Sequence, residues 1–326
     1  MNLRSSLAPH LTLARIAIGL TVGVVGSTHA TAAPTLPYLD PALPMEERVD
    51  DLLARMTLEE KVGQMAQYLG PSRLPKNPVP RKNKADDSAT PDTYDGLSKP
   101  DILNRVRAGQ IGSFLNFYTD PVAEGNELQQ AAAESRLKIP LLFGADAIHG
   151  HAMTKGTTVF PVPIGLAATF DEALVEKTAR VTALEMRATG FQWAFAPNVE
   201  VARDQRWGRV NETFGEDPVL VARMGVATVR GLQGELTNPA TDVLACAKHF
   251  IGGSQPIGGQ NHAPSDFSER TLREVFLPPF TACIEAGAYT LMVAHNEVNG
   301  VPCHANSYLL TDLLKNEFGF RGLAVS

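Results

Sequence analysis

The chain has 326 residues, of which 44% are hydrophobic and 20% are charged, proportions that are usual for a globular protein. Its formal charge is −6 and no cluster of Lys and Arg stands out, so nucleic acid is not an expected partner. The length suits one large domain or two small ones.

The first 33 residues differ in kind from the rest. Arg4 and Arg15 are their only formal charges, an uncharged apolar run covers Ile16 to Gly26, and small residues follow up to Ala33. This order is typical of a secretory signal peptide, and the apolar run is shorter than the about 20 residues that span a bilayer. We therefore expect 1–33 to be removed on export. The mature chain should be periplasmic or extracellular, with no membrane partner.

A helical pattern comes next, from Met45 to Leu69, where apolar residues recur at helical spacing. Within it, Thr57 followed three residues later by Glu60 has the pattern of a capping box, which starts a helix. The segment from Pro71 to Pro100 is long, polar and rich in Pro, Lys and Asp, so we expect it to lie on the surface.

Short apolar runs and helical patterns then alternate to the last residue. Two helical patterns, Asp171–Gly190 and Asp217–Gly234, end on a glycine that favours a helix stop. Strands alternating with helices predict βαβ units and a parallel sheet. The predicted strands are Ile111–Asn116, Pro140–Asp146, Phe191–Pro197, Asp242–Phe250, Tyr289–Asn296 and Gly322–Ser326.

Polar residues gather at the carboxyl ends of these runs: Asp146, Lys248 with His249, and His295 with Asn296. In a (β/α)8 barrel the active site lies at that end of the strands. A closed barrel needs eight strands and the sequence indicates about six, so we expect an incomplete (β/α)8 TIM-type barrel over residues 34–326. The rival is a doubly wound open sheet, although no Gly-rich phosphate turn follows a first strand.

The histidines after the second predicted strand allow two interpretations. His149 and His151 form an H-x-H pattern, and with Lys248, His249 and His295 they are compatible with a metal-dependent hydrolase. Alternatively, both histidines are hydrogen-bonded loop residues that shape the pocket. The three cysteines, Cys246, Cys283 and Cys303, are either buried free thiols or one disulfide and one thiol.

A dense run of charges covers Glu200 to Asp217, and most of these charges must pair with one another. An arginine of this run that faces the pocket can donate to two adjacent hydroxyls. Lys248 and His249 are neighbours, so both reach one site only where the strand frays, a bend that Gly252 and Gly253 allow. Asp146, Arg209, Lys248 and His249 together suit a polyhydroxylated ligand. No pair of reactive carboxylates is evident.

Several long motifs in order make the sequence closely resemble glycoside hydrolase family 3, the β-glucosidases and exo-β-glucan hydrolases. The resemblance runs from about Pro37 to Ser326, with little in the Pro71–Pro100 loop. The motifs are LFGADAIHGH, TVFPVPIGLAATFD, RWGRVNETFGEDP, AKHFIGG, SERTLREVFLPPF, MVAHNEVNGVPCHAN and LLTDLLKNEFGFRGLAVS.

The resemblance implies a first sugar subsite built by Asp146, Arg209, Lys248 and His249, and it implies no metal and no cofactor. His295 is a further candidate, because the family often has Tyr there and His is smaller and titratable. The segment after Phe250 lacks the H-G-D pattern of the N-acetylglucosaminidase branch. We therefore expect a terminal β-D-glucosyl residue of an oligosaccharide or glucan as substrate, and the sequence leaves xylose in place of glucose open.

The same resemblance bears on the residues that react. In this family the nucleophile is an Asp that follows the small apolar run and Ser of the last motif, so it is expected immediately after Ser326. The acid/base comes later, often from a second domain. Retaining glycosidases need two carboxyl groups about 5–5.5 Å apart. We expect a truncated barrel domain with the carboxy-terminal domain absent, no catalytic residue in this chain, and no hydrolysis by it alone. A sugar-binding homologue without activity is the alternative.

Overall fold

The computed structural model describes residues 36–73 and 97–326. The predicted signal peptide and most of the predicted surface loop lie outside the described residues. The chain divides into two units, one that ends at Arg55 and one that starts at Met56. In the first, a 3-10 turn, η1 (Pro37–Leu39), precedes helix α1 (Met45–Arg55). The Tyr38 backbone N–H donates to Asp51 at 3.2 Å, which ties the turn to the helix.

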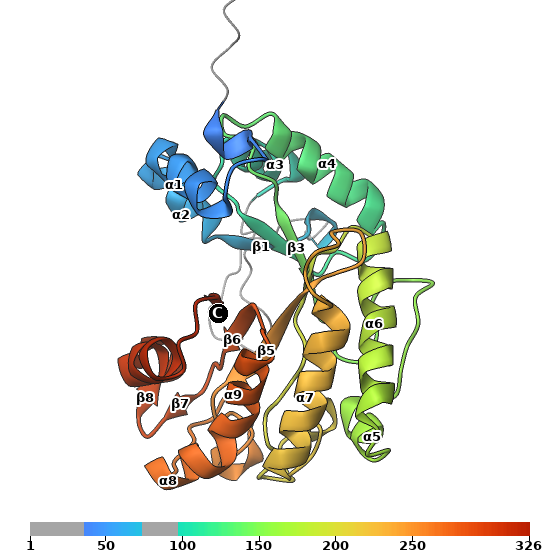
Figure 1. Cartoon of the computed structure of the whole chain (residues 1–326), viewed down its shortest axis with the longest axis vertical. Helices are drawn as coiled ribbons and strands as arrows, with labels where there is room; N and C mark the ends of the chain where they lie inside the picture. The colour runs from blue at the N-terminus through green and yellow to red at the C-terminus, as the bar shows by residue number, and fades with distance from the viewer. Residues whose placement is uncertain (1–35, 74–96) are drawn as a thin grey trace, which may run out of the picture. The chain divides into compact units, whose positions relative to one another are not determined.

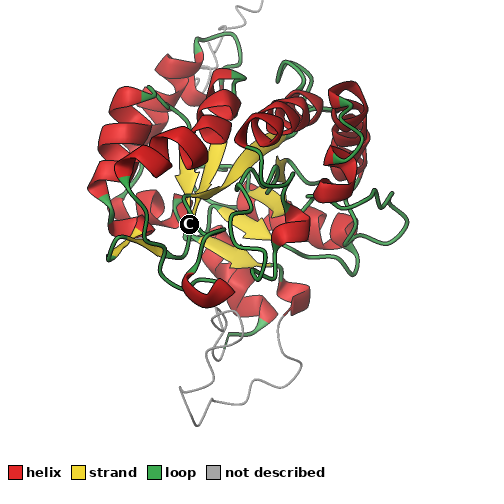
Figure 2. Cartoon of the chain, turned by 90° about the horizontal axis from the view of Figure 1, so that it is seen from below, coloured by secondary structure: helices red, strands yellow, loops and turns green. Residues whose placement is uncertain are grey.

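The second unit contains a parallel sheet of seven strands, each paired with the next one along the chain in the order β1-β2-β3-β4-β5-β6-β9. Figure 2 shows the helices outside and the strands inside. A doubly wound sheet reverses its strand order at a switch point, and this order never reverses. The sheet therefore curls as part of a barrel, which confirms the predicted incomplete (β/α)8-type fold. The strands are β1 (Gln67–Leu69), β2 (Ser113–Leu115), β3 (Leu142–Ala145), β4 (Trp193–Ala194), β5 (Leu244–Phe250), β6 (Thr290–Val293) and β9 (Leu323–Val325).

The helices follow the predicted local signals. Thr57 accepts from the Glu60 N–H while Glu60 accepts from the Thr57 N–H, so the capping box is confirmed. Asp171 caps α6 and Asp217 caps α7, and α7 lies between α6 and α9 (Figure 1). The helices of this unit are α2 (Leu58–Gln64), α3 (Lys99–Arg107), α4 (Pro121–Ala133), α5 (Pro163–Ala167), α6 (Glu172–Ala188), α7 (Pro218–Gln233), α8 (Glu269–Thr271), α9 (Leu277–Glu285) and the π-helices η5 (Leu272–Phe276) and η7 (Tyr308–Glu317).

The sheet has seven strands, one more than the six that the sequence indicated. The additional strand is β1, which lies inside the run that was interpreted as helical. Its three residues are too short for a period-2 pattern to appear against the helical spacing before them. A hairpin of β7 (Glu297–Val298) and β8 (Val301–Pro302) was also missed, because each of its strands has only two residues.

The two faces of the sheet have separate apolar clusters. On the inner face Trp193, Phe195 and Cys246 pack together, and Trp193 donates to the Thr290 hydroxyl at 2.7 Å. The larger cluster packs between the sheet and the helices. Because side chains alternate along a strand, Lys248 shares the inner face with Cys246. This alternation directs the lysine toward the barrel interior at the carboxyl end of β5.

The three cysteines are free and buried, which confirms the first of the two alternatives. Within residues 36–73 and 97–326, the helices are too short or too polar to cross a membrane.

Candidate active site

Asp146 and Lys248 form an ion pair across the carboxyl ends of β3 and β5. The Lys248 ammonium donates to the Asp146 carboxylate at 2.7 Å, and only 3% of the lysine side chain is exposed, against 46% for the aspartate. Burial would raise the pKa of Asp146, but the charge and hydrogen bond of Lys248 outweigh it, so the pKa lies below its ordinary value. The carboxylate is ionised and faces the open side of the site.

Asn116, the residue directly after β2, fixes the second oxygen of Asp146. Its amide donates to the Asp146 carboxylate at 3.1 Å, and its carbonyl accepts from the Asp146 backbone N–H at 3.2 Å. The Tyr118 hydroxyl donates to the same Asn116 oxygen. Both oxygens of Asp146 therefore have fixed donors, and the carboxylate has one orientation.

His249 also faces the site, although simple alternation would place it opposite Lys248. The pairing of β5 with β6 shifts register between Lys248 and Phe250, a bulge that re-aims the side chain between them. Arg209 then lies 3.2 Å from His249 Nε2 and donates two hydrogen bonds to Glu212, at 2.9 and 2.7 Å. The lysine and histidine thus reach one site through a bulge inside β5, and not through the frayed strand end at Gly252 and Gly253 that the sequence suggested.

Glu200, from the loop after β4, lies behind His249. Its carboxyl group is 2.8 Å from His249 Nδ1, and the residue is 2% exposed. Burial raises the pKa of Glu200 to about 8. Burial, with the charges of Lys248 and Arg209, holds the pKa of His249 well below its usual range. At neutral pH the histidine is uncharged.

His295 lines the same cavity as Arg209 and His249, at its exposed side. Its ring centroid lies 5.4 Å from that of His262 and 5.2 Å from that of His304. The cavity is also lined by Glu200, Trp207, Gly253, Asn261, Ala294 and Asn296. His295 therefore stands at the rim of this cavity.

His149 and His151 behave as loop residues. His151 is fully buried, its Nε2 lies 2.8 Å from the Thr154 hydroxyl, and its ring packs edge-on against Phe191. His149 Nδ1 contacts the Phe160 carbonyl at 3.0 Å. These contacts support the second interpretation of the H-x-H pattern. In the part of the chain that the structure describes, no group of three or more His, Cys, Asp or Glu is placed to hold a metal ion.

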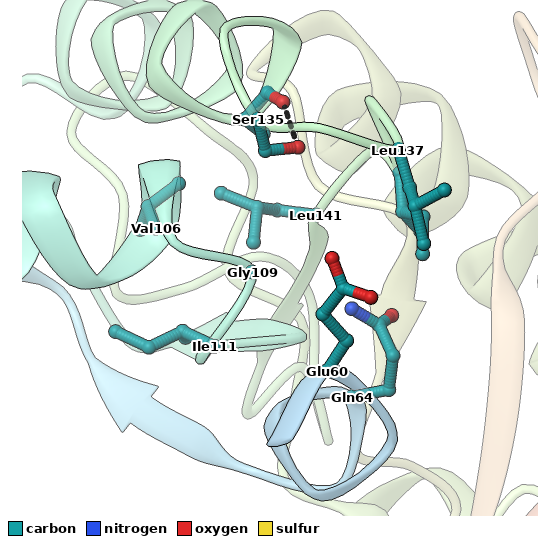
Figure 3. Close-up of a pocket in the computed structure, with 10 residues that line it drawn as sticks. Glu60, Gln64, Val106, Gly109, Ile111, Ser135, Leu137 and Leu141 are labelled. Atoms are coloured by element: carbon teal, nitrogen blue, oxygen red, sulfur yellow. Dashed lines mark hydrogen bonds between the residues drawn. The ribbon is translucent and has the colours of Figure 1, made fainter. Parts of the chain in front are cut away.

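Another cavity lies at the amino ends of the strands and is lined by residues that precede β1, β2 and β3. Figure 3 shows Glu60 and Gln64 of α2 facing Val106, Ile111 and Leu141 there. Glu60 accepts from Arg136 at 3.0 Å and from the Thr57 N–H at 2.9 Å. Its carboxylate is thus engaged in capping a helix and in an ion pair, at the opposite edge of the sheet from Asp146.

Comparison with known proteins identifies the family of the chain. Residues 57–326 match the glycosyl hydrolase family 3 N terminal domain. The chain belongs to glycosyl hydrolase family 3. It is 37% identical over 279 residues to a periplasmic beta-glucosidase of Salmonella typhimurium, covering 85% of this chain and 32% of that protein. It is 47% identical over 206 residues to a beta-xylosidase of Formosa agariphila, and this match covers 61% of this chain and 28% of that protein.

Solved structures of the family have the same fold. A beta-glucosidase from Listeria innocua, in complex with isofagomine, matches with a TM-score of 0.71 and 34% identity over 86% of this chain and 36% of that one. An exo-1,3/1,4-beta-glucanase from a Pseudoalteromonas species matches with a TM-score of 0.73 and 34% sequence identity. The match covers 87% of this chain and 34% of that one. This chain therefore spans about a third of the length of the relatives that it matches.

The structure places the predicted family 3 residues Asp146, Arg209, Lys248 and His249 at one end of the sheet, with His295 at the rim. Their role in binding sugar stays a prediction. Sequence analysis missed Asn116. This residue directly follows a strand, as Asp146 does, and its strand-end position could have marked it as a site residue. It also left Glu200 and Glu212 among the structural charges. Only their contacts with His249 and Arg209 assign them to the site.

Proposed function

We propose that this chain forms the sugar-binding part of an exported retaining β-glucosidase that removes terminal β-D-glucosyl residues from oligosaccharides or glucans. The ion pair of Lys248 with the half-exposed Asp146 carries the proposal. Carboxylates and cations bind sugar hydroxyls through charge-assisted hydrogen bonds. The names of family relatives, which include beta-glucosidases and an exo-1,3/1,4-beta-glucanase, support a glucosyl substrate.

In this proposal the site offers a fixed acceptor and fixed donors to the sugar. Asp146 accepts from one or two hydroxyls, and Arg209 and Lys248 donate to neighbouring ones. Asn116 and Glu212 already hold Asp146 and Arg209 in place, so little ordering remains to be done on binding. His295 contacts the sugar or the leaving group from the rim.

The carboxylates of this site are all committed to other partners. Asp146 pairs with Lys248, Glu212 holds Arg209, and Glu200 is buried behind His249. A retaining glycosidase needs one carboxylate free to attack carbon and another to protonate the leaving oxygen. We propose that both come from outside the described residues, and that residues 34–326 alone bind sugar without cleaving it.

A second candidate substrate is a β-xyloside. It is favoured by the 47% identity to a beta-xylosidase over 206 residues. Xylose lacks the hydroxymethyl group of glucose, so the two sugars differ only where the pocket meets that group.

Calorimetric titration of the 326-residue chain with glucose and with xylose tests these proposals. We expect saturable glucose binding that Asp146→Asn weakens by about tenfold or more, a loss of about 1.4 kcal/mol. Glu235→Gln, an exposed carboxylate after α7, is the matched control and should bind as the parent chain does. Stronger binding of xylose would select the second substrate, and binding of neither sugar would overturn the proposal.

We also propose export with cleavage between Ala30 and Ala33. The periplasmic location in the names of two relatives supports it. Amino-terminal sequencing of secreted protein should start within or just after those residues, and a mature protein that starts at Met1 would contradict export by cleavage.

A further inference from the structure

A continuous line of polar contacts runs from Glu212 to Glu200 through the site. Glu212 accepts two hydrogen bonds from Arg209, Arg209 lies 3.2 Å from His249 Nε2, and His249 Nδ1 lies 2.8 Å from Glu200 Oε2. The direction of each hydrogen bond along this line is not free, because arginine can only donate.

The arginine decides the tautomer of His249. Since Arg209 donates to Nε2, that nitrogen carries a lone pair and no proton. The neutral ring must then carry its proton on Nδ1, which donates to Glu200 Oε2. The other oxygen of Glu200 takes no part in this hydrogen bond.

That other oxygen, Glu200 Oε1, is buried without a partner, and so is Asn296 Oδ1. The two residues are 2% exposed each. Asn296 has its amide nitrogen fixed by the Glu297 carbonyl at 3.1 Å and the Ile251 carbonyl at 3.5 Å, so its oxygen cannot exchange places with its nitrogen without losing both. Two buried acceptors therefore lack a donor in the same part of the site.

Both oxygens lie beside Gly253. A Cβ atom placed on it would be 2.8 Å from Glu200 Oε1 and 3.1 Å from Asn296 Oδ1. Both oxygens thus converge on one small volume. Buried polar groups almost always have a partner, and one proton between these two oxygens satisfies both.

We propose that Glu200 is a neutral carboxylic acid in the native protein, donating its Oε1 proton to Asn296 and accepting the Nδ1 proton of His249. Glu200 is then a positioning residue that holds His249 neutral with the Nε2 lone pair directed into the site. Burial, which raises the pKa of Glu200 to about 8, agrees with this state. The ionisable groups that face Glu200 are Arg209, Glu212, Lys248, His249, His262 and Cys303.

The consequence, which rests on the proposed function, is that His249 acts toward the sugar as a hydrogen-bond acceptor. In the free site Arg209 occupies the single Nε2 lone pair, so a sugar hydroxyl has to take the place of the guanidinium there, donating to Nε2 while accepting from Arg209 or Lys248. Sugars that replace this hydroxyl by fluorine lose the donor and should bind more weakly.

Glu200→Gln is the deciding variant, because glutamine has the shape and hydrogen-bonding pattern of a protonated glutamate. Its carbonyl accepts from His249 and its amide donates to Asn296. Glu200→Leu has neither group, so it removes both hydrogen bonds and serves as the disruptive comparison. Glu235→Gln is the control. All are made in the full 326-residue chain.

The first measurement is nitrogen-15 NMR of the histidine rings without sugar, with His249→Gln to assign the signal among the eight histidines. We expect a protonated Nδ1 and an unprotonated Nε2 at pH 7 in the parent and in Glu200→Gln. An imidazolium ring, or a proton on Nε2, would overturn the inference. Because no sugar is present, this result is independent of whether the chain binds glucose, which tests the proposed function separately.

The second measurement is the unfolding temperature between pH 6 and pH 9. The native carboxyl keeps its proton up to about 8 while the unfolded one loses it near 4.5, so stability falls as pH rises through this window. Glutamine cannot titrate, so the unfolding temperature of Glu200→Gln should rise relative to that of the parent chain as pH rises. A pH-independent difference, or a Gln variant as damaged as Glu200→Leu, would show an ionised Glu200 and refute the inference.

Discussion

The two ends of the sheet each have a cavity with a glutamate, and they use it differently. At the amino ends Glu60 caps its own helix and pairs with Arg136, whose side chain is 55% exposed. At the carboxyl ends Glu200 meets His249 inside the protein, with 2% exposure and with Oε1 unpartnered. Among the described residues that line the amino-end cavity, each buried side-chain polar atom has a partner.

This difference separates a structural end from a functional one. An ion pair with an exposed partner, such as Glu60 with Arg136, contributes little free energy. Buried ionisable groups cost desolvation and persist only where the rest of the fold holds them. In a (β/α)8 barrel the active site occupies the carboxyl ends and stability residues the amino ends. Variants at the two ends should therefore separate sugar binding and catalysis from stability.

The largest effect is expected from Asp146→Ala at the carboxyl ends. The change removes the acceptor for the sugar and leaves the buried Lys248 ammonium unpaired. In a protein with the length of its relatives, kcat/KM for nitrophenyl β-glucoside should fall by about 10²–10³-fold. Glu60→Gln at the amino ends is the matched control and should leave kcat/KM unchanged. Equal losses in both variants would contradict the distinction between the ends.

Glu212→Gln should have the next largest effect. It removes the negative charge that receives two hydrogen bonds from Arg209 and leaves the guanidinium free to turn. Glucose affinity, measured by calorimetry, should fall by about tenfold, since a charge-assisted hydrogen bond contributes about 1.5–3 kcal/mol. Glu216→Gln, on the same loop, should bind normally. Unchanged affinity in Glu212→Gln would mean that Arg209 does not need this support.

The pH dependence of stability is sensitive to His249. Its native pKa is well below the usual 6.5, so the native ring stays neutral where the unfolded one is charged. This difference lowers stability as pH falls below 6.5 and has no effect above it. The unfolding temperature of the parent minus that of His249→Gln should rise from about pH 5 to about pH 6.5 and then stay level. A difference that grows as pH falls would contradict a neutral ring.

Thr57→Ala should have the smallest effect. It removes the hydroxyl that caps α2 at the structural end, and loss of such a cap costs about 1 kcal/mol of unfolding free energy. Chemical denaturation measures this loss. Glucose affinity should be the same as in the parent chain, and a change in affinity would show that the two ends are coupled.

Local signals made much of the fold predictable. The capping box at Thr57 and the Asp caps of α6 and α7 act within three residues of the chain, so a short stretch of sequence contains both partners. The alternation of apolar runs and helical patterns predicted the parallel sheet. A three-residue strand such as β1 has no such pattern, because its pairing with β2 alone defines it.

The residue types and strand-end positions of Asp146, Lys248 and His249 were visible in the sequence by itself, as was their resemblance to family 3. Only the tertiary structure decided which charges meet. Lys248 reaches Asp146 across 102 residues, the β5 bulge turns His249 into the site, and burial places Glu200 behind it. Pairing and desolvation depend on which groups the fold brings together and on how much water it excludes, and neither quantity is local to a stretch of chain.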